Sequence, residues 1–113
     1  HGKVTSEPKR MRTILDHANH PCVVACWNSN PQDMDESKSI TSNFELLKKD
    51  IEHVHINEIG VYQYPWQDLF NRLKAMDYKG WCLAEIAFNP EPERFMKFYK
   101  TLFDMFTGNY AFP

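Results

Sequence analysis

Three polar residues that suit metal binding or proton transfer each follow a short apolar run of this chain. Asn28 follows a run that ends in an aromatic residue, His55 follows Val54, and Glu85 follows the stretch 82–84. Short apolar runs bounded by turn residues are typical of buried strands, and helical patterns between them indicate parallel βα units. The carboxyl ends of parallel strands carry the ligands and catalytic groups of such proteins. We therefore expect the three side chains to gather on one rim of a sheet.

The elements that must position these residues follow from hydrophobic periodicity and from helix start and stop signals. Pro21 pushes the residue before it out of the helical region, and Ser42 with Glu45 predicts a capping box for the second helix. The predicted fold class is α/β, in the order αβαβαβα. Helices are expected over about 7–19, 42–49, 64–78 and 90–107, and parallel strands near 22–28, 51–57 and 80–86.

Side-chain alternation predicts what each face of this sheet carries. In the second strand His53 and His55 share one face, while Val54 and Ile56 share the other. Three parallel strands cannot close a barrel, and an open parallel sheet needs both faces covered. Helices cover one face, and the other is expected to expose Cys22, Val24, Cys26, Trp81 and Leu83. A second chain, a missing half or the chain's own ends must cover it, and we expect a homo-oligomer.

Composition narrows the class of protein. With 113 residues the chain suits a single domain, 1–113, and is too short for a complete βα barrel of about 250 residues. A mean hydropathy of -0.57 and a formal net charge of -2 argue against a membrane span and a nucleic-acid interface, and favour small polar substrates. The three cysteines form no paired motif, which predicts reduced thiols in a cytoplasmic protein.

Four segments then carry a family resemblance. His1-Gly2, residues 21–28, residues 53–58 and residues 80–85 resemble the C-terminal half of the xylose isomerase-like TIM barrel superfamily, which includes sugar phosphate isomerases and epimerases. The resemblance covers nearly the whole chain, with the motifs in the order and spacing of the family. It implies a partial, half TIM barrel and a sugar or sugar phosphate as substrate.

The resemblance also implies a divalent metal, Mn, Mg, Zn or Co, held by a glutamate, an aspartate, a histidine and a second glutamate. Carried onto this chain, Asn28 takes the aspartate position, His55 the histidine and Glu85 the last glutamate, which is also the catalytic proton shuttle. The first glutamate would lie just ahead of His1. That glutamate is absent and Asn28 is neutral, so the chain is either a truncated relative or half of a symmetric dimer.

Each of these residues also has a structural interpretation. A salt bridge to lysine or arginine competes with the metal role of Glu85, a core position with that of His55, and a turn with that of Asn28. Substrate contacts are expected from five residues, among which the tryptophans stack on sugars or simply fill the core: Trp27, Asn30, Glu58, His1 and Trp66.

Three functions remain open at this point. The leading one is a metal-dependent sugar (phosphate) isomerase or epimerase, or a truncated and inactive relative, which moves a proton between adjacent carbons through an enediolate. The alternative is a non-catalytic carbohydrate-binding or assembly module formed by a dimeric half-barrel. Metal-dependent DNA repair is the third, and the acidic balance disfavours it.

Overall fold

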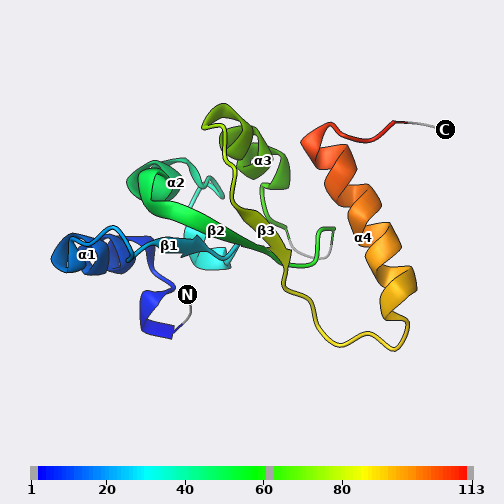
Figure 1. Cartoon of the computed structure of the whole chain (residues 1–113), viewed down its shortest axis with the longest axis horizontal. Coiled ribbons are helices and arrows are strands. Elements are labelled where there is room, and N and C mark those ends of the chain that lie inside the picture. Colours follow the sequence, from blue (N-terminus) through cyan, green and yellow to red (C-terminus); the bar gives the residue numbers. More distant parts are fainter. Residues whose placement is uncertain (1–2, 61–62, 112–113) are drawn as a thin grey trace.

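The computed structural model describes residues 3–60 and 63–111, which form a mixed α/β fold around a three-stranded parallel sheet (Figure 1). The sheet order is β1-β2-β3, so each strand lies beside its neighbour in sequence. The predicted order αβαβαβα is confirmed, with elements α1 (Pro8–Ala18), β1 (Ala25–Trp27), α2 (Thr41–Leu47), β2 (Ile51–Ile56), α3 (Trp66–Ala75), β3 (Trp81–Ala84) and α4 (Pro92–Thr107). Short 3-10 turns add η1 (Lys3–Thr5), η2 (Pro31–Asp33) and η3 (Lys48–Asp50).

Several elements are shorter than predicted, and the start of β1 and the capping box of α2 differ for reasons that the structure shows. Strand β1 is only three residues long, because the apolar residues before it form a turn in which Val23 N donates to His20 O. Helix α2 begins at Thr41 with Ile40 at its N-cap, so Ser42 lies inside the helix and makes no capping box with Glu45. Hydrophobicity alone does not separate a strand from an apolar turn.

One face of the sheet carries the core. Val54 and Ile56 of β2 are buried, as the two-residue alternation predicts. Trp27 of β1 lies on the same side, because its ring packs edge-on against Phe44 of α2 at 5.2 Å between centroids. Leu69 of α3 belongs to the same buried cluster. This face is therefore closed by helices.

The opposite face is bare, as expected. The strand register pairs His53 with both Cys26 and Trp81, and pairs His55 with Leu83. Trp81 is 73% exposed and Leu83 43% exposed, although both are large apolar side chains of strand β3. We call this set of Cys26, His53, His55, Trp81 and Leu83 the bare sheet face. Val24 and Cys22, just before β1, are exposed as well.

Helix α4 stands beyond β3, on the side of the sheet away from α1 (Figure 1). The Tyr99 hydroxyl donates to Ile56 O at 2.8 Å and to Asn57 O at 3.0 Å, which ties the helix to the end of β2. Phe103 packs edge-on against Phe70 of α3 at 5.3 Å. The helix ends at Gly108, whose φ of 76° suits a residue without a side chain. Among the described residues, no helix combines the length and apolar character that crossing a bilayer requires.

Candidate functional site at the carboxyl ends of the strands

His55 and Glu85 meet at the carboxyl ends of β2 and β3. His55 Nδ1 lies 3.3 Å from Glu85 Oε2, and both side chains remain accessible, at 36% and 53%. The backbone explains the contact, because β2 and β3 pair in parallel and Glu85 N extends the ladder by donating to Ile56 O at 2.9 Å. No lysine or arginine pairs with Glu85 in the described chain, so its side-chain partner there is this histidine.

Asn28 lies at the same end of the sheet, where its backbone carbonyl takes part in hydrogen bonds between the ends of β1 and β2. Its carbonyl accepts from Asn57 Nδ2 at 3.1 Å, and the same amide donates to Ser29 O at 3.0 Å. Ser29, with a positive φ of 50°, donates its hydroxyl to His55 O at 2.9 Å. Asn28 is only 8% exposed. These contacts favour the turn interpretation of this segment, and the metal role of Asn28 stays a prediction. No described hydrogen bond joins the Asn28 side chain to His55.

Beneath this turn lies a buried polar network that the sequence analysis missed. Trp27 Nε1 donates to the Tyr64 hydroxyl at 2.9 Å, and that hydroxyl donates to Asp33 Oδ2 at 3.2 Å. The same carboxylate oxygen accepts from Asn30 N at 2.7 Å, within a capping box that starts η2. Asp33 is fully buried, and this burial raises the pKa of its carboxyl to about 7.

Several residues predicted to bind substrate are placed in structural roles instead. Trp27 and Trp66 are 1% and 4% exposed, so both indoles are core residues and offer no face to a sugar. Asn30 caps η2 with its side chain. Glu58 does lie near the rim, where its Oε1 accepts from Ala87 N at 3.3 Å in the segment that follows Glu85. His1 lies outside the described residues.

The donor set at the rim fits part of a metal site. An imidazole and a carboxylate are ligands that Mn²⁺ and Zn²⁺ accept. No group of three or more histidine, cysteine, aspartate or glutamate side chains suited to a metal occurs within 3–60 and 63–111. Burial raises the pKa of Cys26, on the bare sheet face, which disfavours the thiolate form that a metal would need. His55 and Glu85 could therefore supply two ligands to a metal, and further ligands would have to come from water, substrate or another chain.

The three cysteines are free, as predicted, with Cys22 exposed and Cys26 and Cys82 half-buried.

No protein-family model, curated protein or solved structure matches this chain.

Proposed function

We propose that the carboxyl-end rim of the sheet is part of a metal-dependent sugar (phosphate) isomerase or epimerase site, and that the three βα units are part of a barrel. The observation that carries this proposal is the contact between His55 and Glu85, two accessible groups from neighbouring parallel strands at the end where such folds hold their ligands. The resemblance described above favours the same pair of residues.

The chain's own groups fit distinct tasks in this reaction. Glu85 is the proton carrier: its carboxylate takes a proton from the carbon next to the sugar carbonyl and returns it to the former carbonyl carbon. The hydroxyl proton of the first carbon passes to the former carbonyl oxygen, so that an aldose and a ketose interconvert with no net change in atoms or electrons. His55 and Glu85 would hold a divalent metal, which when bound would supply Lewis-acid polarisation of the sugar carbonyl. His55 holds Glu85 in position through Nδ1, while Ser29 fixes the backbone of His55.

Proton exchange tests this proposal directly. The protein is incubated in D₂O with Mn²⁺ and a panel of aldoses, ketoses and their phosphates, and deuterium at the carbons beside the carbonyl is followed by NMR. We expect incorporation with the wild type, loss with Glu85→Gln, and retention with Glu52→Gln, which alters an exposed carboxylate in β2 itself. No incorporation above a protein-free control with any sugar contradicts the proposed activity.

A non-catalytic carbohydrate-binding or assembly module is the second candidate. It is favoured by Asn28, which is neutral and 8% exposed where the proposed reaction would use a carboxylate ligand, and by the bare sheet face. Saturation-transfer NMR distinguishes the two, because this module binds a sugar without exchanging its protons and without a requirement for metal.

A further inference from the structure

Both edges of the sheet are free within the described residues. Strand β2 is central, with β1 and β3 at the edges. Glu85 N points toward β2, where it donates to Ile56 O. Backbone groups alternate in direction along a strand, so those of Cys82 and Ala84 point away from β2, toward the free edge. A row of unpaired N–H and C=O groups is a template for another strand.

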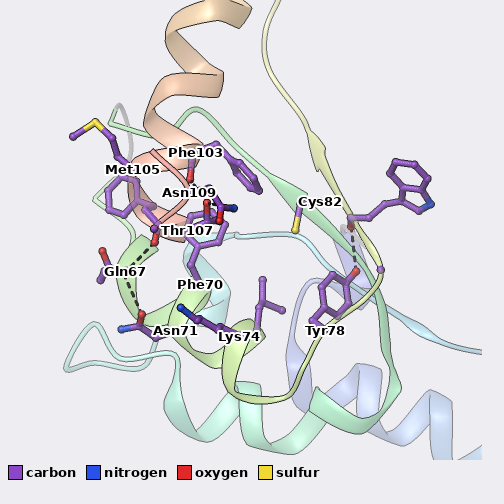
Figure 2. A pocket seen from close by; sticks show the side chains of 15 residues that line it. Gln67, Phe70, Asn71, Lys74, Tyr78, Cys82, Phe103, Met105, Thr107 and Asn109 are labelled. Carbon is purple, nitrogen blue, oxygen red and sulfur yellow. Dashed lines mark hydrogen bonds between the residues drawn. The ribbon is translucent and has the colours of Figure 1, made fainter. Parts of the chain in front are cut away.

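Space for such a strand lies beside this edge. A groove of about 590 Å³ separates β3 from α3 and from the last turns of α4 (Figure 2). Cys82 and Tyr78 line one side of it, while Phe70 and Phe103 lie across from them (Figure 2). Of the described residues that line the groove, only Lys74 is charged. Gly80, Trp81 and Cys82 line the groove, so it borders the strand whose edge is free and offers space for an additional strand next to β3.

The bare sheet face adds a second reason for a partner. Trp81 and Leu83 expose apolar surface on the strand whose edge is free, and Cys26 continues this surface on β1. Phe88, in the segment after β3, is 93% exposed. A partner that only added a strand would leave this surface in water, whereas a partner with its own bare sheet would bury it.

We propose that the partner is a second copy of this chain, whose β1 pairs in parallel with β3 while its bare sheet face covers that of the first copy. A two-fold axis running along the strands makes β3 of each copy meet β1 of the other. Both contacts form at once, so no edge remains free and assembly stops at the dimer. The second copy supplies the required free parallel edge, because its own β1 is an edge strand. The small net charge of -2 leaves little repulsion between copies.

The same symmetry completes the rim. Strands that run parallel about a common axis place all their carboxyl ends at one end of the dimer, so the two His55–Glu85 pairs share one rim. The second Glu85 is then the group on the opposite face of the substrate carbon that an epimerase needs beside the first. This step rests on the proposed function, whereas the pairing of the sheets does not.

Native mass measured by light scattering over a range of concentrations tests the pairing. We expect twice the chain mass of 13.4 kDa for the wild type. Leu83→Asp places a charge on the bare sheet face, and Ala84→Pro removes an N–H at the free edge that β2 does not use, so both variants become monomers. Met96→Asp introduces the same charge at an exposed position on α4, outside the bare sheet face, and remains a dimer.

Circular dichroism shows whether each variant keeps its helices, and only folded variants are compared. A monomeric wild type at every concentration overturns the proposal, as does a dimer that persists in either folded variant. A dimer without Mn²⁺ affinity leaves the pairing standing and removes the shared metal site. A monomer that binds Mn²⁺ overturns the pairing and leaves the metal site standing, because the metal ligands then need no second copy.

Discussion

His55 and Glu85 are 30 positions apart in the sequence, and their side chains meet at 3.3 Å because β2 and β3 run in parallel with matched ends. The contact depends on the sheet and on little else, since neither residue is buried. The turn that follows β1 reinforces it through Ser29, whose hydroxyl bonds the backbone of His55. Two groups with complementary chemistry are thus held together by backbone pairing, with their outer sides left accessible.

The buried carboxyl of Asp33 predicts a pH-dependent stability. Its folded-state pKa of about 7 lies above the ordinary value of 3.8, so the folded chain keeps a proton that the unfolded chain releases. The free energy of unfolding therefore falls as the pH rises from about 4 through 7. Asp33→Asn, which cannot ionise, should remove this contribution. Urea unfolding of both proteins across this pH range measures it, and equal slopes would contradict the burial of an ionisable carboxyl at this position.

Asn57 should be important for stability because one amide group joins two strand ends. Its Nδ2 donates to Asn28 O and to Ser29 O. Asn57→Ala leaves these two carbonyls without that donor, and we expect a loss of about 1 to 3 kcal/mol in the free energy of unfolding. The matched control is Asn71→Ala on α3, where an exposed side chain accepts from Gln67 and the change should stay within about 0.5 kcal/mol. Similar losses in both variants would mean that the turn is not held by Asn57.

Gly80 should not tolerate a side chain. A Cβ at this position would lie 2.3 Å from the Tyr78 hydroxyl and 2.5 Å from Glu52 O, which are themselves hydrogen-bonded to each other. Gly80→Ala must therefore displace Tyr78 or shift the start of β3, and we expect about 1 to 3 kcal/mol of destabilisation. Thermal unfolding measures the effect. An unchanged midpoint would show that Tyr78 is free to move.

The cysteines should react with a thiol reagent in a defined order. Cys22 is exposed, whereas burial raises the pKa of Cys82 to about 11 and also raises that of Cys26. Because the thiolate is the reactive form, single-cysteine variants at pH 8 should label fastest at Cys22 and slowest at Cys82. Labelling rates measured with an aromatic disulfide test this order. Rapid reaction of Cys82 would contradict the half-buried position of its thiol.

The sequence was sufficient to predict the element order and the two faces of β2. Val54 and Ile56 alternate with two histidines, and this two-residue period places the apolar pair in the core and the histidines on the opposite face. The meeting of His55 with Glu85 followed from the same logic, because parallel strands bring their carboxyl ends together. The start of β1 could not be predicted, since Val23 and Val24 are as apolar as strand residues and yet precede the strand.

The buried network was beyond sequence reasoning for a different reason. Asp33 lies in a polar stretch that is typical of a surface loop, and its partner Tyr64 is 31 positions away. The one local signal was the spacing of Asn30 and Asp33 around Pro31, which is typical of a capping box. Trp27 was ambiguous because an aromatic side chain at a strand end suits a core and a sugar site equally. Only the packing of Trp27 on Phe44 decides for the core.

Calorimetric titration with Mn²⁺ tests most directly the proposal that His55 and Glu85 bind a divalent metal at the carboxyl ends of the strands. We predict saturable binding by the wild type, loss of binding in Glu85→Gln and His55→Ala with unchanged thermal midpoints, and unaltered binding in Glu52→Gln. Equal Mn²⁺ affinity in all four proteins, or none in the wild type, would contradict the assignment of this rim as a metal site.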